Sequence, residues 1–209
     1  MAGTDAYGWQ SRVYDLVIEP VNAPVRRVAR RQVDLPPGAV VLDVGCGTGT
    51  ALAEYASEGF EVLGTDQSPS MLEQARRRLR DAADLRLTDG PSIPFEDGRA
   101  DLVLVSLLLH SVSRGEAAAL LDEVGRVLAP GGRVLVTDFG TEGLKFPRGV
   151  AMRAVTALAE LAAGPRHAAH GLGYVRDGGL GGLLGPGWVV EREKHLAGGN
   201  ITVTVLAPR

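Results

Sequence analysis

Residues 40–49, with the sequence VVLDVGCGTG, combine an apolar run, an acidic residue and a glycine-rich turn. The run 39–44 is short and rich in valine, so it predicts a buried β-strand. Glycines permit a tight turn and let a ligand approach the backbone without a Cβ in the way. Residues 50–57 then predict a helix, whose first N–H groups have no partner inside the helix. These flanks make the turn stronger evidence for a ligand site than an isolated glycine-rich loop.

Short β-branched runs alternate with longer helical patterns along the chain, which predicts an α/β fold with a parallel sheet and crossover helices. Further strands are expected at 61–65, 84–87, 101–105, 133–138, 188–195 and 201–206, the last two joined by a hairpin turn at 197–200. Further helices are expected at 10–32, 69–79, 113–128 and 150–163. Pro20 and Pro24 can interrupt the first of these, and Ser68 is the expected N-cap of the second.

Composition excludes several functional classes. The net charge of −3 gives no basic footprint for nucleic acid, and the arginines at 26–31 and 76–78 fit solvated helix faces. The single cysteine, Cys46, excludes a disulfide within the chain and a cysteine-cluster metal site. Residues 1–10 lack an apolar signal core, and the most apolar run, 102–109, is far shorter than the roughly 20 residues of a spanning helix. We therefore expect a cytoplasmic protein without a membrane span.

Two further acidic residues follow predicted strands. Asp66 lies 23 residues after Asp43, and in nucleotide-binding α/β folds a carboxylate about 20 residues beyond the turn accepts hydrogen bonds from ribose hydroxyls. Asp89 follows the next strand, where it can accept from an exocyclic amine. Met71 suits either packing against a flat base or ordinary core packing.

Five segments in this order resemble class I S-adenosylmethionine-dependent methyltransferases. They are 42–49 (LDVGCGTG), 66–72 (DQSPSML), Asp89 with Ile93-Pro94-Phe95, 101–106 (DLVLVS) with Leu109-His110, and 126–133 (RVLAPGGR). The resemblance covers about residues 12 to 140 and is nearest to small-molecule methyltransferases of the quinone-biosynthesis type. It implies a Rossmann-like, seven-stranded, mostly parallel sheet with a C-terminal antiparallel hairpin and helices on both faces.

The resemblance also implies which residues contact S-adenosylmethionine. Around the methionine part it places Asp43, Gly45, Cys46, Gly47, Thr48 and Gly49, with Ser106 and Leu107 lining the same side. Asp66, with Gln67 beside it, would hold the ribose, Met71 would pack on the base, and Asp89 and Gly90 would meet the adenine. Tyr14 resembles part of an N-terminal segment that closes over the cofactor.

The expected organisation is a single methyltransferase domain over residues 1–209. Its parts are an N-terminal helical segment (1–35), a cofactor-binding core (36–140), a substrate lid (141–186) and a C-terminal hairpin (187–209). One crossover helix with long loops remains an alternative to the lid. The sequence carries no signal for an oligomeric state.

The implied reaction is methyl transfer to a small molecule. The donor sulfonium is already electrophilic, so the enzyme mainly aligns the acceptor and excludes water, and a base is needed only if the acceptor loses a proton. Histidine titrates near neutral pH, so His110 is a candidate base, with Asp138 as a second catalytic candidate; capping or packing is the alternative for both. His167, His170 and Tyr174 can reach the acceptor, and no metal site is expected.

Other functions fit less well. A nicotinamide-dependent oxidoreductase would need G-x-G-x-x-G, but Thr50 stands at the third glycine. A catalytically silent binding module remains open, because methyl transfer needs no identifiable catalytic residue. The favoured acceptor is apolar or aromatic, such as a quinone, lipid or polyketide. This preference rests on the resemblance and on apolar residues of the lid, namely Leu144, Phe146, Val150, Met152, Leu158 and Leu161.

Overall fold

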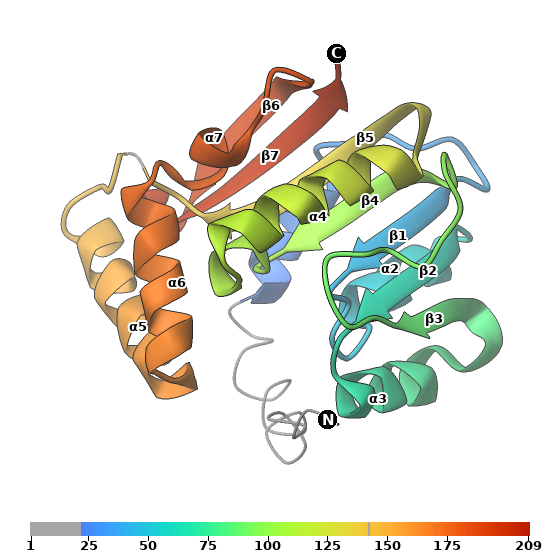
Figure 1. Ribbon diagram of the computed structural model, residues 1–209, viewed down its shortest axis with the longest axis horizontal. Helices are drawn as coiled ribbons and strands as arrows, with labels where there is room; N and C mark the ends of the chain where they lie inside the picture. Colours follow the sequence, from blue (N-terminus) through green and yellow to red (C-terminus); the bar gives the residue numbers. More distant parts are fainter. Residues whose placement is uncertain (1–21, 142) are drawn as a thin grey trace.

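A computed structural model describes residues 22–141 and 143–209, which form one mixed sheet with helices on both faces (Figure 1). The strands are β1 (Val40–Val44), β2 (Glu61–Asp66), β3 (Ala83–Leu87), β4 (Ala100–Ser106), β5 (Leu128–Phe139), β6 (Trp188–Leu196) and β7 (Ile201–Pro208). Their order in the sheet is β3-β2-β1-β4-β5-β7-β6. The first five are parallel, whereas β7 runs antiparallel to both β5 and β6. The predicted fold class is confirmed.

Residues 22–30 are helical, and further helices cover the sheet or extend beyond it. They are α2 (Thr50–Ser57), α3 (Pro69–Leu79), α4 (Arg114–Val127), α5 (Arg148–Ala163), α6 (Pro165–Arg176) and α7 (Gly179–Leu183), with short 3-10 turns η1 (Arg80–Ala82), η2 (Leu109–Ser111) and η3 (Ala197–Gly199). Local capping explains two of the starts. Ser68 accepts from the Met71 N–H, and Ser113 and Glu116 form a reciprocal capping box at the start of α4.

The core lies in two layers, one on each face of the sheet. On one face α4 packs Leu121 and Val124 against the valines of β4 and β5. On the other face α2 and α3 pack Leu52 and Leu72 against β1, β2 and β4. Because helices cover both faces of the sheet, the central strands carry apolar side chains on both sides. They therefore appear in the sequence as continuous hydrophobic runs.

Three sequence expectations are corrected by the structure. Pro24 does not break the helix, since residues 22–30 are helical throughout. Strand β5 begins at Leu128 rather than at residue 133, because Leu128 pairs with Ala100 ahead of a register shift. Residues 164–186 contain α6 and α7, so the alternative of one crossover helix with long loops is wrong. Helix α6 buries Ala168, Gly171 and Tyr174, so tertiary packing outweighs the low helix propensity of glycine.

The parallel strands bring their carboxyl ends to one edge of the sheet. Asp43 lies near the end of β1, Asp66 ends β2, Ser106 ends β4 and Asp138 lies near the end of β5. Ligands of open α/β sheets bind at this edge. Over residues 22–141 and 143–209, no helix combines the length and apolar character needed to cross a membrane.

Candidate functional site

The glycine-rich turn follows β1 and has three glycines with different tasks. Gly45, Gly47 and Gly49 have φ of 75°, 54° and 75°, the left-handed region that favours glycine. A Cβ on Gly49 would lie 2.9 Å from Leu79, and one on Gly45 would lie 3.1 Å from Leu108. Nothing lies within 4 Å of the corresponding position on Gly47. Two glycines are thus needed for packing, whereas Gly47 leaves space on the open side of the turn.

Asp66 fixes this turn from the end of β2. One carboxylate oxygen accepts from the Gly47 N–H at 2.7 Å, and the other accepts from the Ser68 N–H at 2.8 Å. A carboxylate only accepts hydrogen bonds, which is what ribose hydroxyls require of a partner. Gln67 beside it is exposed. The arrangement suits the predicted ribose contact.

Asp43 gives the site a strong preference for a cationic ligand. It is buried, and burial raises the pKa of its carboxyl to about 7, with a further increase from the charge of Asp66 and an opposing effect from Arg26. Two carboxylates therefore lie close enough to repel each other where water is scarce. A ligand that carries positive charge, such as a sulfonium with an ammonium group, would relieve this repulsion.

Arg78 braces the turn from α3. Its guanidinium donates to the Thr48 carbonyl, to Thr48 Oγ1 at 2.8 Å and to Thr50 Oγ1 at 2.9 Å. Arg26 likewise pairs with Glu54 on α2 at 2.9 Å. Both arginines are expected from the sequence to lie on solvated helix faces. Arg78 is exposed as expected, although it bonds to the turn, whereas Arg26 is half-buried. Sequence reasoning did not consider that a basic side chain such as Arg78 could bind the carbonyl and hydroxyl oxygens of this turn. Cys46 is buried, and burial raises the pKa of its thiol, so it packs as a neutral group.

The loop after β3 carries Asp89 and Gly90. Asp89 is exposed, and no atom lies within 4 Å of a Cβ built on Gly90, so this part of the loop is open. Thr88 Oγ1 donates to the Ser92 carbonyl at 2.7 Å and closes the loop on itself. Met71 is buried at the start of α3, which agrees with a packing role.

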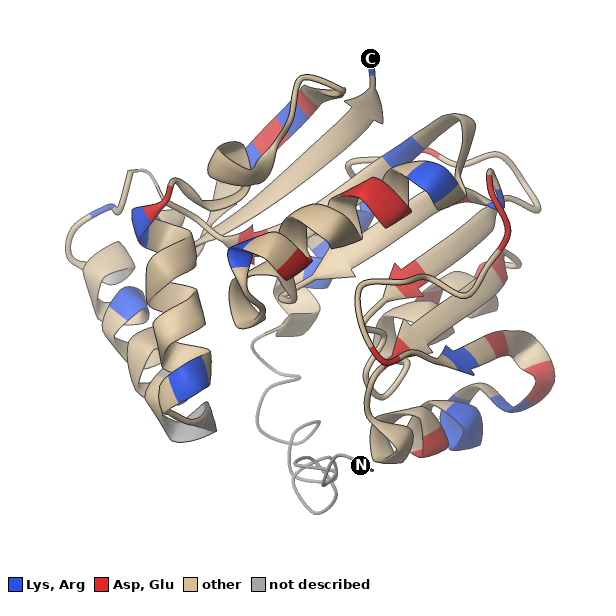
Figure 2. Cartoon of the chain, in the orientation of Figure 1, with Lys and Arg blue, Asp and Glu red and all other residues tan. Residues whose placement is uncertain are grey.

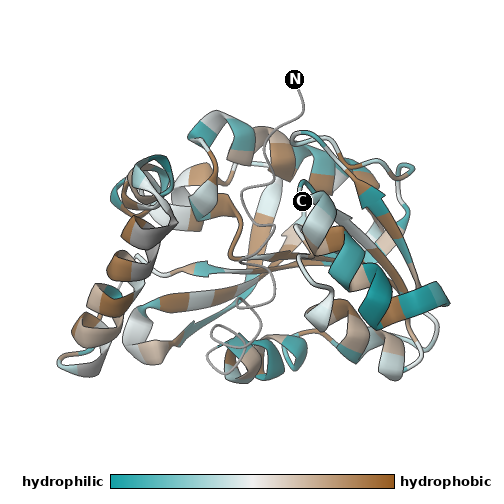
Figure 3. Ribbon diagram, turned by 90° about the horizontal axis from the view of Figure 1, so that it is seen from below, coloured by the Kyte–Doolittle hydropathy of each residue, from teal (hydrophilic) through white to brown (hydrophobic). Residues whose placement is uncertain are grey.

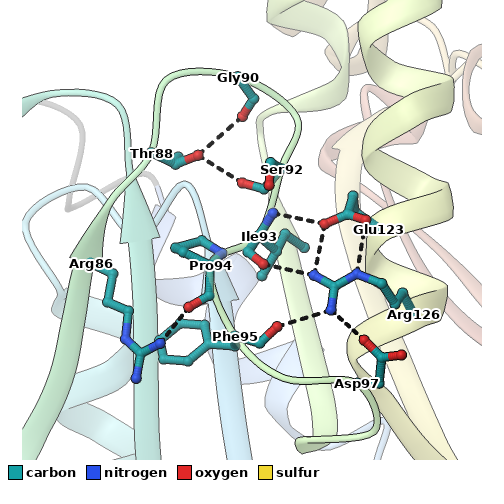
Figure 4. Close-up of polar contacts among 10 residues, drawn as sticks. All are labelled: Arg86, Thr88, Gly90, Ser92, Ile93, Pro94, Phe95, Asp97, Glu123 and Arg126. Carbon is teal, nitrogen blue, oxygen red and sulfur yellow. Dashed lines mark hydrogen bonds and ion pairs between the residues drawn. The ribbon is translucent and has the colours of Figure 1, made fainter.

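Helix α4 holds the far side of that loop (Figure 4). Arg126 donates to the Ile93 carbonyl at 2.7 Å and to the Phe95 carbonyl at 3.0 Å, while Glu123 accepts from the Ile93 N–H at 3.0 Å. Arg126 also pairs with Glu123 and Asp97. The hydrogen bonds from Arg126 and Ile93 lower the pKa of Glu123 to about 2. The loop after β3 is therefore fixed by a charged pair that the sequence motifs did not reveal.

A sharp turn after β4 directs the next residues toward two parts of the site. Ser106 and Leu107 are half-buried, and Leu107 has φ of 52°, which is uncommon for a residue with a side chain. The Leu107 N–H donates to the Thr137 carbonyl at 2.7 Å, which holds the turn against β5. Leu108 then reaches Gly45, and His110 reaches Asp138.

His110 and Asp138 form a buried pair. His110 Nδ1 lies 2.6 Å from Asp138 Oδ1, and the two side chains are 5% and 3% exposed. Asp138 also accepts from the N–H groups of Leu109 at 2.9 Å and Phe139 at 2.7 Å. A carboxylate only accepts, so Nδ1 carries the proton and Nε2 is the basic nitrogen of neutral His110. Phe139 stacks on the imidazole with ring centroids 3.9 Å apart.

Helix α6 adds three side chains around this pair. The rings of His167 and Tyr174 lie edge-on to His110, with centroid distances of 5.7 Å and 6.5 Å. Burial and the charge of Asp138 raise the pKa of Tyr174, so its hydroxyl stays protonated. His170 Nδ1 donates to the Ser111 carbonyl at 3.1 Å, which ties α6 to η2.

Some predicted residues are not brought to this site. Tyr14 lies outside the described residues. The apolar residues expected to favour an apolar acceptor point largely outward, with Phe146 86%, Leu158 67% and Leu161 61% exposed. That part of the argument for the acceptor is therefore wrong, because these side chains do not line an enclosed pocket.

Comparisons with known proteins agree with this geometry. Residues 41–132 match the family described as a methyltransferase domain. The fold and the glycine turn agree with this match: residues 41–132 resemble a methyltransferase domain, and S-adenosylmethionine is the cofactor of that class. A demethylmenaquinone methyltransferase of Beutenbergia cavernae is 38% identical over 135 residues, which cover 63% of this chain and 55% of the relative. The chain spans about half the length of the curated relatives it matches.

Solved structures share the fold. A TehB-like S-adenosylmethionine-dependent methyltransferase of Corynebacterium glutamicum has a TM-score of 0.62 at 18% identity, covering 96% of this chain and 98% of that one. Phosphoethanolamine N-methyltransferase 2 of Haemonchus contortus, in complex with S-adenosylmethionine, has a TM-score of 0.52 at 26% identity, covering 63% of this chain and 32% of that one.

Proposed function

We propose that the chain transfers a methyl group from S-adenosylmethionine to a small aromatic acceptor with an ionisable hydroxyl, of the quinol type. The observation that carries this proposal is the buried His110–Asp138 pair at the carboxyl edge of the sheet, linked to the glycine turn through Leu108. Relatives named demethylmenaquinone methyltransferase support the acceptor class.

The cofactor is held by residues of the turn and of β2. Asp43 and Asp66 present negative charge toward a cationic ligand, and Gly47 leaves room beside them. The open loop at Asp89 and Gly90 receives the adenine end, and Ser106 and Leu107 face the methionine end. When bound, S-adenosylmethionine supplies an electrophilic methyl group.

His110 serves as the general base. Its Nε2 accepts the hydroxyl proton of the acceptor, so the electron pair of the O–H bond is shared with the aromatic ring. A ring carbon would then take the methyl group as the carbon–sulfur bond of the donor breaks, and the proton of that carbon would move to the oxygen and restore the aromatic hydroxyl. Asp138 keeps the Nδ1 proton in place and stabilises the imidazolium that forms. Phe139 holds the plane of the imidazole, and the protonated Tyr174 closes one side of the pair. The imidazolium then releases its proton to water.

The test uses 1,4-dihydroxynaphthalene as acceptor and mass spectrometry of the product. We expect a singly methylated product that depends on S-adenosylmethionine. His110→Gln should lower kcat by about 10²–10⁴-fold, the usual contribution of general acid–base catalysis, and remove the acidic limb of the pH–rate profile. Its affinity for S-adenosylhomocysteine, measured by calorimetry, should stay close to that of the wild type.

Asp66→Ala provides the complementary variant, because it should weaken cofactor binding without a specific effect on the acidic limb. Glu73→Ala, on the exposed side of α3, is the matched control and should change neither property. Wild-type turnover by His110→Gln would remove His110 from the mechanism. Cofactor binding without methylation of any aromatic hydroxyl would instead indicate a binding module.

A further inference from the structure

Helix α5 exposes an outer face without a described charged side chain. We call this the α5 face. It consists of Val150, Ala151, Ala154, Val155, Ala157, Leu158 and Leu161, all exposed. The exposed fractions of its larger members are 49% for Val150, 60% for Val155, 67% for Leu158 and 61% for Leu161. Phe146, 86% exposed, precedes it, and Leu172, 69% exposed, lies on the neighbouring α6.

Two described polar residues of α5 face the protein instead. Arg153 donates to the Gly140 carbonyl, and Thr156 Oγ1 accepts from Asn200 Nδ2 at 2.8 Å. An ordinary surface helix buries its apolar stripe and exposes its polar stripe, so α5 has the reverse arrangement. A contiguous apolar surface of this kind marks an interaction site. In Figure 3 the ribbon of this part of the molecule is coloured largely as hydrophobic.

The charge around the α5 face indicates which kind of partner surface can cover it. Residues 141–177 contain five basic and three acidic residues, a net charge of +2, with Arg176 paired to Asp177, whereas the rest of the chain carries 17 basic and 22 acidic residues. Helices α5 and α6 show lysine or arginine and no described acidic residue (Figure 2). Symmetric pairing of two copies through this face would bring the net positive segments of both copies together. An anionic surface is complementary to it.

We propose that the α5 face docks the enzyme on an anionic lipid bilayer, with α5 lying in the plane of the membrane interface. At 16 residues, or roughly 24 Å, the helix is suited to lying along the interface rather than crossing it. Its apolar side chains enter the boundary between headgroups and acyl chains, and Lys145 and Arg166 face the anionic headgroups.

The position of α5 connects this surface to the acceptor site. The helix follows β5, which carries Asp138, and packs beside α6, which contacts η2 and places His167 and Tyr174 near His110. This inference rests on the proposed function in one respect: a membrane-dissolved apolar quinol would be taken up where the enzyme docks.

The test is co-sedimentation of the full chain with phosphatidylcholine vesicles and with vesicles that also contain phosphatidylglycerol. We expect binding to the anionic vesicles that weakens as salt is raised. Val155→Glu should reduce partitioning at least about tenfold, since it places a charge in the apolar face. Leu87→Glu, at a side chain 53% exposed on β3, is the matched control and should bind like the wild type.

Two results would overturn the proposal. One is the absence of vesicle binding, or binding that Val155→Glu leaves intact. The other is a dimer in vesicle-free buffer that Val155→Glu dissociates, which would assign the face to a second copy. Methylation of 1,4-dihydroxynaphthalene in vesicle-free solution separates this proposal from the enzymatic one. In that assay Val155→Glu should retain wild-type turnover. Vesicle binding by a wild-type protein that shows no turnover would contradict the proposed function and leave the docking proposal intact.

Discussion

Asp43 illustrates at the residue scale how a ligand site can lower the stability of the free protein. Its carboxyl is buried with a pKa raised to about 7, chiefly by loss of hydration and then by the charge of Asp66. The native state therefore holds this proton to a higher pH than the unfolded chain, whose value is near 3.8. The stabilising contribution is complete below the unfolded pKa and is lost as the pH rises through 7.

Asp43→Asn should consequently be more stable than the wild type at pH 8. The pKa difference sets an upper limit of about 4 kcal/mol, and we expect a gain of a few kcal/mol that shrinks at pH 5. Urea unfolding at the two pH values measures it. Equal differences at pH 5 and pH 8 would show that the ionisation of Asp43 is not the cause. The same variant should bind S-adenosylmethionine more weakly, because the charge that attracts the cation is gone.

At the scale of elements, the Glu123–Arg126 pair of α4 decides how firmly the loop 88–97 is held. Glu123→Gln should lower the free energy of unfolding by about 1–2 kcal/mol at pH 7, a range suited to a charge-assisted hydrogen bond that is partly exposed to water. The lowered pKa of Glu123 means that its contribution is present above pH 4.5 and is lost as the pH falls through 2.

The difference between Glu123→Gln and the wild type should thus narrow between pH 5 and pH 2 in denaturant titrations. Glu96→Gln, an exposed glutamate of the same loop, serves as control and should be close to neutral at every pH. A gap that stays constant on acidification would mean that Glu123 contributes through its shape rather than its charge.

The elements that sequence reasoning predicted are those with local signals. Ser68 and Ser113 mark the starts of α3 and α4 because each caps its own helix. The glycines of the turn after β1 predict backbone with positive φ, as observed. The existence of α6 was missed, because its stability comes from packing against η2 rather than from its glycine-rich sequence. The outward orientation of the apolar residues of the segment 141–186 was also missed, because it depends on tertiary packing rather than on local sequence.

The residues of the candidate site likewise fall into those that the sequence predicts and those that depend on the tertiary fold. The residues of the turn, Asp66 and Asp89 follow from motifs and spacing. The His110–Asp138 pair depends on the register of β4 with β5, where Ser106 lies opposite Thr137 and so brings the following residues of both strands together. Arg78 and Arg126 act on loops about 30 residues away in sequence, and no local pattern distinguishes them from solvated arginines.

At the scale of the whole molecule, the strand order places the C-terminal strand inside the sheet rather than at its edge. Strand β7 lies between β5 and β6, and Val134 of β5 pairs with Leu206 (Figure 1). Leu206 is fully buried in the same cluster as α4. Contacts this distant in sequence form late, so the sheet is completed only when β7 is in place.

Leu206→Ala should therefore destabilise the whole protein rather than the hairpin alone. Deleting a buried leucine typically costs about 2–5 kcal/mol, whereas Val190→Ala, at a 46% exposed position paired with Leu206 on β6, should cost less than about 1 kcal/mol. Urea unfolding followed by circular dichroism and by tryptophan fluorescence should give one coincident transition, shifted equally for both probes by Leu206→Ala. A second transition in circular dichroism that Leu206→Ala does not move would mean that α5–α7 unfold as a separate unit, and the expectation of a single cooperative domain would then be wrong.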